Sequence, residues 1–178
     1  MPTAASMLDA FGQNFPGLTR LLTMLAYLIG MWAGASMGLL LWRRQRVEGS
    51  VTLGALLMRM LLCAVFLYLP TAVSTAQDTV FASPTILSYS PGHGVSEHGK
   101  QVLDVVIRFV QLVGLWAFIW GWVLLNRAHA RGYDPGLGSK GWAHIVGGLL
   151  CMNSVATLHG LAQSLGLESL LTGLLIPG

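Results

Sequence analysis

The stretch from residue 21 to residue 42 carries no charged side chain and holds Gly30, Gly34 and Gly38 at a spacing of four. At this spacing the three glycines share one face of a helix. In a water-soluble helix each glycine costs about 1 kcal/mol relative to alanine. In lipid the helix is enforced, because an unsatisfied backbone group costs more than the entropy of glycine. A face of small residues also lets a second helix approach closely. The stretch therefore predicts a membrane-spanning helix with a tightly packed neighbour.

The composition of the chain leads to the same class of protein. Hydrophobic residues make up 54% of the 178 residues, charged residues make up 10%, and the mean hydropathy is +0.65. Soluble domains carry about 25% charged residues. So few charges cannot cover a water-exposed surface, and we interpret residues 1–178 as one membrane domain. Cys63 and Cys151 lie in apolar runs, which favours buried thiols over a disulfide.

Four apolar runs are candidates for membrane spans, at residues 21–42, 51–69, 103–125 and 141–165. As a helix, the first run would be about 33 Å long, enough to cross a hydrocarbon core of about 30 Å. Residues 70–102 show no clear periodicity, and we predict an outer loop there that lies on the membrane surface or on a partner. The expected fold is all-α, with four transmembrane helices arranged as two helical hairpins.

The basic residues indicate the orientation of these spans. They gather in the connections after the first and the third span, at Arg43, Arg44, Arg46, Arg127, Arg131 and Lys140. By the positive-inside rule these connections are cytoplasmic, so both termini and the long loop lie outside. A cleaved signal peptide, with Ala33-Gly34-Ala35 as its cleavage site, is an alternative for the first span, and the charges that follow the run argue against it.

A second stripe of small residues recurs in the fourth span at the same spacing of four. Antiparallel alignment of the first and fourth spans pairs Gly38 with Ala143, Gly34 with Gly147 and Gly30 with Cys151. We therefore predict that these two spans cross closely at the six residues, within one chain or between two copies. Replacement of Gly34 by leucine is then expected to disrupt folding or assembly.

Arg59 interrupts the second span, about 12 Å from its cytoplasmic end by helix rise. An arginine inside the membrane costs a few kcal/mol unless it pairs or snorkels. Two interpretations stay open: snorkelling to the headgroups, or a contact with a lipid phosphate, a partner carboxylate or a water-filled path. Arg44 and Arg46 are further candidates for contact with a lipid phosphate. Asp104 and Arg108 are four residues apart and predict a local ion pair.

Patterns for covalent catalysis, phosphate binding or nucleotide binding are not found in the sequence. We therefore predict no enzyme and no catalytic, cofactor-binding or metal-binding residues. His93 and His98 flank Glu97 without an evident third close ligand, whereas zinc sites normally take three or four protein ligands. Asn153, in the fourth span, is expected to form a hydrogen bond between helices.

Two segments carry a family resemblance. From Leu62 to Pro91 an apolar run ends in a proline and is followed by Thr-Val-Phe and a Ser/Pro stretch that leads to a tyrosine. After the third span, a basic connection leads to KGWAHIVGGLLCMN, from Lys140 to Asn153. Together these segments resemble small inner-membrane proteins of type IVB secretion and conjugation systems, the IcmC/DotE proteins and the related plasmid transfer protein TraQ. The resemblance implies membership of an apparatus that moves DNA or protein across the bacterial envelope, and it implies no catalytic residues.

The expected function is that of a multimerising inner-membrane component of such an apparatus, with a structural or assembly role. In a pilin-like version, Arg44, Arg46 or Arg59 meets bound phospholipid. The expected partners are further copies of the chain, other membrane proteins of the transfer system and phospholipid. Sequence-specific binding of nucleic acid is not expected, because the basic residues flank the spans. The alternative is a small stand-alone channel or transporter. That function predicts several polar groups converging at mid-membrane, and the sequence offers few candidates beyond Arg59 and Asn153.

Overall fold

The computed structural model describes residues 10, 12, 14–46, 52–81, 97–130 and 133–166, and of residues 43–46, 97–101 and 159 it describes the backbone alone. These residues form the helices α2 (Phe15–Arg46), α3 (Leu53–Leu67), α4 (Leu69–Phe81), α5 (Glu97–His129), α6 (Pro135–Met152) and α7 (Ser154–Leu165). The fold is all-α, as predicted.

Two of the helices are long and apolar enough to cross a membrane alone. Their apolar parts, Phe15–Trp42 in α2 and Val102–His129 in α5, are 28 residues each, or about 42 Å of helix. α3 continues into α4 through a bend of 97°, and α6 continues into α7 through a bend of 94°. If each bent pair is one span, the described residues hold four candidate spans, as the sequence predicted.

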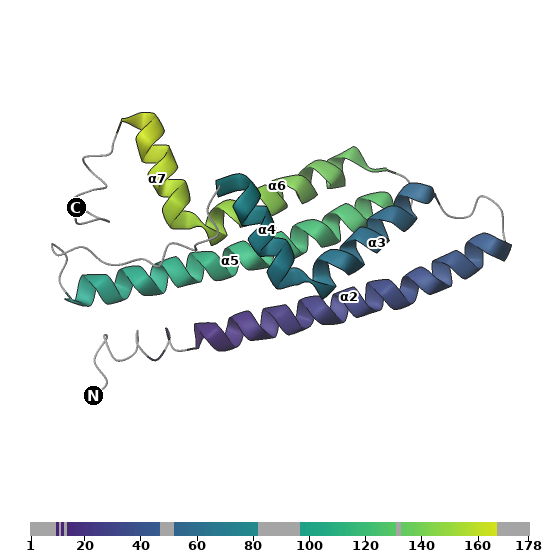
Figure 1. Ribbon diagram of the computed structural model, residues 1–178, viewed down its shortest axis with the longest axis horizontal. Coiled ribbons are helices and arrows are strands. Elements are labelled where there is room, and N and C mark those ends of the chain that lie inside the picture. Colours follow the sequence, from purple (N-terminus) through teal and green to yellow (C-terminus); the bar gives the residue numbers. More distant parts are fainter. Residues whose placement is uncertain are drawn as a thin grey trace.

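Both halves of the chain have the same order of elements, a long helix followed by a bent pair (Figure 1). α5 lies in the middle of the bundle, with α6 on one side and α3 and α2 on the other (Figure 1). α5 packs most extensively on α6, and α2 packs mainly on α3. The hairpins of the fold are therefore α2–α3 and α5–α6.

The first bend falls at Tyr68, whose backbone angles, φ −114° and ψ 33°, leave the helical range. Pro70 has no N–H to donate to the Phe66 carbonyl, so the helix cannot continue unbroken. The chain resumes as α4, in which Leu69 and Gln77 are buried and Val73 packs against the core. The predicted outer loop is therefore wrong over residues 70–81, which form α4, and over residues 97–102, which begin α5. Residues 82–96 lie outside the described residues.

The second bend falls at Asn153, with φ −110° and ψ 47°. The hydroxyl of Thr157 donates to the backbone oxygen of Leu150 at 3.0 Å and to that of Asn153 at 2.9 Å. This side chain thus supplies a partner to the Leu150 carbonyl at the bend. The fourth span, predicted as one run over 141–165, is instead the pair α6 and α7.

α6 begins at Pro135, earlier than the predicted residue 141, because Asp134 caps it. The Asp134 Oδ1 accepts hydrogen bonds from the N–H groups of Gly136 at 2.8 Å and Leu137 at 3.3 Å. Asp134→Ala is expected to lower the free energy of unfolding by about 1 kcal/mol, because the helix loses this cap. Thermal unfolding in detergent measures the change. Asp78→Ala, which removes an exposed carboxylate far from a helix start, is the control and should show no such loss.

Candidate functional site

The glycine stripe of α2 faces α3, its own hairpin partner. A Cβ atom added to Gly30 would lie 3.0 Å from the Cβ of Phe66, and one added to Gly34 would lie 3.1 Å from the Sγ of Cys63. Both distances are tighter than nine in ten real Cβ contacts. The two backbones therefore approach more closely here than larger side chains would allow. The close neighbour predicted for this stripe is the second span.

An even closer contact joins α5 and α6. A Cβ added to Gly148 would lie 2.6 Å from the carbonyl oxygen of Gly114 and 2.7 Å from the backbone nitrogen of Phe118. A Cβ added to Gly121 would lie 2.8 Å from the carbonyl oxygen of Gly141. The two glycine pairs are separated by seven residues on each helix, which is two turns. The backbones of this antiparallel hairpin therefore touch at two levels.

This glycine contact was not predicted from the sequence, because the spacing of four in the fourth span pointed to Ala143, Gly147 and Cys151. The signal was present as a spacing of seven. Gly114 and Gly121 in the third span match Gly141 and Gly148 in the fourth when the two spans run antiparallel. A search for matched heptad glycines in neighbouring spans would have found the pair.

The structure separates the residues of the predicted crossing between spans one and four. Gly30 and Gly34 contact α3, and the Cβ of Cys151 is 2.9 Å from a Cβ added to Gly114 on α5. A Cβ added to Gly38 or Gly147 would meet nothing within 4 Å among the described residues, and Ala143 is exposed. α2 and α6 lie on different sides of α5 (Figure 1). The crossing within one chain is therefore wrong at these residues, and the crossing between two copies stays a prediction.

Arg59 lies in α3, about 9 Å of helix rise after Leu53. Its side chain is half-buried, and its Nε has no hydrogen-bond partner among the described residues. A buried donor without a partner costs about 1–3 kcal/mol. This favours a partner outside the described residues and leaves the kind of partner open. Arg44 and Arg46 lie in the last turn of α2, where the structure describes only the backbone.

The ion pair predicted for α5 is formed. The Arg108 Nε donates to the Asp104 Oδ2 at 2.8 Å, and both side chains are about half exposed. An exposed pair of this kind contributes little to stability, about 0–1 kcal/mol. Asn153 is buried at the second bend, and its side chain makes no hydrogen bond to the rest of the described chain. The predicted bond between helices is therefore not made within the described part of the molecule.

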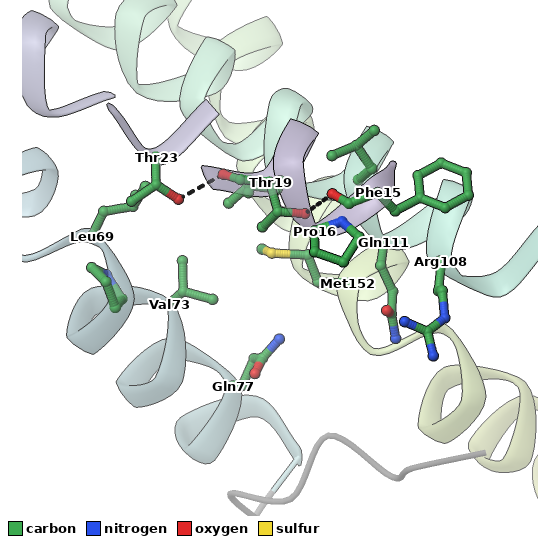
Figure 2. A pocket seen from close by; sticks show the side chains of 13 residues that line it. Phe15, Pro16, Thr19, Thr23, Leu69, Val73, Gln77, Arg108, Gln111 and Met152 are labelled. Carbon is green, nitrogen blue, oxygen red and sulfur yellow. Dashed lines mark hydrogen bonds between the residues drawn. The ribbon is translucent and has the colours of Figure 1, made fainter. Parts of the chain in front are cut away.

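A cavity of about 350 Å³ lies where the two bent pairs meet the beginning of α2. Leu69 and Pro70 line it from the first bend and Met152 lines it from the second, so both helix breaks reach the same cavity. Figure 2 shows the side chains of Thr19 and Thr23, which come from α2 and face this space. The cavity lies at the end of the bundle away from the arginines that close α2.

A metal centre finds no support in the described residues, where no three side chains of His, Cys, Asp or Glu gather. His93 lies outside these residues, and of His98 the structure describes only the backbone. No protein-family model, curated protein or solved structure matches the chain. The function therefore has to be argued from the helix contacts and the cavity.

Proposed function

We propose that the protein is a multimerising component of a type IVB secretion or conjugation apparatus in the bacterial inner membrane, with a structural or assembly role. The observation that carries this proposal is the pair of unfilled small-residue faces, at Gly38 on α2 and at Ala143 and Gly147 on α6. Small residues at the lipid-exposed surface let helices of separate chains approach closely. The choice of a type IVB secretion or conjugation apparatus rests on the resemblance described above, in the segments from Leu62 to Pro91 and from Lys140 to Asn153.

The two faces are suited to a head-to-tail assembly. α2 and α6 lie on different sides of α5, so one copy can present α2 to the α6 of the next copy (Figure 1). Such a contact joins two different surfaces and generates a ring if the rotation closes, or a filament if it does not. A ring suits a channel lining or an assembly platform, and a filament suits the pilin-like version.

The rest of the proposal follows the charge pattern and the absence of catalytic motifs in the sequence. With the basic connections in the cytoplasm, both termini are periplasmic. The partners are other copies, further membrane proteins of the apparatus, and phospholipid at Arg44, Arg46 or Arg59. The protein has no enzymatic role in this proposal and does not bind a specific nucleic acid sequence.

The experiment compares Gly38→Leu and Gly147→Leu with the wild type in mild detergent. We expect the wild type to form oligomers in native mass spectrometry and both variants to be monomers. Their helical content by circular dichroism should stay unchanged, because nothing in the described chain lies within 4 Å of the new Cβ. In the source cell, deletion of the gene should abolish transfer of DNA or protein, and neither variant should restore it.

Monomeric wild type in mild detergent and in nanodiscs would contradict the assembly. A genome in which no conjugation or secretion gene lies near this gene, together with normal transfer after its deletion, would contradict the system. The two parts of the proposal are thus tested separately.

A small stand-alone channel or transporter is a second candidate, favoured by the two helix breaks that reach one cavity. Broken helices in corresponding positions of two repeats mark the substrate site in many transporters. Uptake or conductance by the purified chain in liposomes would favour this function, and inactive liposomes that contain folded protein would exclude it.

A further inference from the structure

The cavity at the two bends is apolar over most of its surface and carries a few polar side chains. Its apolar walls come from side chains such as Leu69, Val73 and Met152. Figure 2 shows the side chains of Gln111 and Arg108 beside each other on α5, and that of Gln77 across the space from them on α4. A molecule that matches this lining is apolar along most of its length and carries a polar group at one end.

Gln77 is the first sign that the cavity holds a ligand. Its side chain is only 5% exposed, and it makes no hydrogen bond to the described residues. The amide atoms of Gln77 are not among the fully buried polar atoms that lack a partner in the described residues, so the amide is accessible from the cavity. Because Gln77 faces the cavity in Figure 2, a polar group inside the cavity can supply the missing partner.

Arg108 indicates that the polar group of the ligand is negatively charged. Its Nε is taken by Asp104, and the guanidinium makes no other hydrogen bond to the described residues. The two Nη groups therefore remain available to an anion at the rim of the cavity, in the parallel geometry that suits phosphate oxygens. The carboxylate of Asp104 opposes that anion, which makes the preference for negative charge moderate.

The position in the membrane identifies the source of such a ligand. The apolar part of α2 is about 42 Å long, against a hydrocarbon core of about 30 Å. The cavity is lined by the first residues of this helix, such as Phe15, and therefore lies near the headgroup layer on one side of the bilayer. Lipid phosphates and the upper parts of acyl chains occur together at this depth.

We propose that the cavity holds one phospholipid, with an acyl chain between α2, α4 and α5 and its phosphate at Gln77, Gln111 and Arg108. The site lies apart from the predicted lipid contacts at Arg44 and Arg46. The proposal of a bound phospholipid rests on the cavity alone, so it does not depend on whether the chain belongs to a transfer apparatus.

The first test fills the cavity with a side chain. Phosphatidylglycerol is titrated onto the purified full chain in mild detergent, and bound lipid is counted by native mass spectrometry. We expect one tightly bound lipid per wild-type chain and an affinity at least about tenfold lower for Val73→Trp, which occupies the site of the acyl chain. Val80→Trp is the matched control on the same helix, because Val80 is 57% exposed and does not line the cavity.

The second test changes the charge at the rim. Arg108→Gln should lower the affinity for phosphatidylglycerol about tenfold, as expected for loss of a charge-assisted hydrogen bond. Asp104→Asn should raise the affinity severalfold, because it removes the opposing carboxylate. A gain of affinity cannot come from misfolding, so this variant remains informative if Val73→Trp does not fold.

Three results would overturn the proposal. The first is a wild-type chain that retains no lipid, which would mean a water-filled cavity. The second is equal binding by Val73→Trp and Val80→Trp, which would place the lipid elsewhere on the surface. The third is full displacement of the lipid by millimolar inorganic phosphate, which would make the site one for a free anion.

Discussion

Replacing Gly148 by leucine is expected to separate α6 from α5 and to prevent accumulation of folded protein. A Cβ at this position would lie 2.6 Å from the Gly114 carbonyl oxygen, so the side chain meets backbone and cannot be accommodated by a rotamer change. Overpacking in a core costs about 1–3 kcal/mol and sometimes more, and a clash with backbone belongs at the upper end of that range. We expect the free energy of unfolding to fall by more than about 3 kcal/mol.

The control for this change is the adjacent residue. Gly147→Leu places the same side chain on the same turn of α6, where nothing in the described chain lies within 4 Å. Thermal unfolding of the two variants in detergent that keeps the chain monomeric, with fluorescence or circular dichroism, measures the difference. Equal stability of the two variants would mean that α5 and α6 do not touch at Gly148.

Replacing Gly34 by leucine is the second large effect that we expect. The new Cβ would lie 3.1 Å from the Sγ of Cys63, and the rest of the leucine would push α3 away from α2. The cost should be about 2–3 kcal/mol, smaller than at Gly148, because a side chain rather than backbone has to move. Cys63→Ala should recover part of the loss in the double variant.

Gly38 is the control for Gly34, because it lies one turn further along α2 and has no neighbour in the described chain. In detergent that keeps the chain monomeric, we expect Gly34→Leu to lower the unfolding temperature and Gly38→Leu to leave it unchanged. A wild-type unfolding temperature for Gly34→Leu would contradict the contact between α2 and α3.

Hydropathy and charge were sufficient to predict the helical membrane fold and its two hairpins. The uncharged run at residues 21–42 lies inside α2, and the run at residues 103–125 lies inside α5. Both are long helices with few buried residues, so their composition alone carries the information. The ends of α6 depend on local chemistry instead, at the Asp134 cap and at the Asn153 bend.

The two helix bends and the packing partner of each helix could not be predicted from hydropathy and charge. A hydropathy window adds up residues along a run and carries no direction, so it joined α6 and α7 into one span. It also ended the second span at Pro70, because the residues that follow show no clear periodicity, although Gln77 among them is buried. The choice between Gly147 and Gly148 is a rotation of about 100° on the helix, and only the packing of α5 decides it.

The shortness of α3 has a consequence for the lipid around the protein. With 15 residues, α3 is about 22 Å long and ends where α4 turns away by 97°. Thr71, Ser74, Thr75 and Asp78 are exposed on α4 and favour water or headgroups as their surroundings. We expect the apolar layer beside α3 to be several ångströms thinner than the usual 30 Å or so, at an elastic cost shared by the surrounding lipids. The protein would locally thin the bilayer, and a thickness profile of the surrounding lipid would show this thinning beside α3.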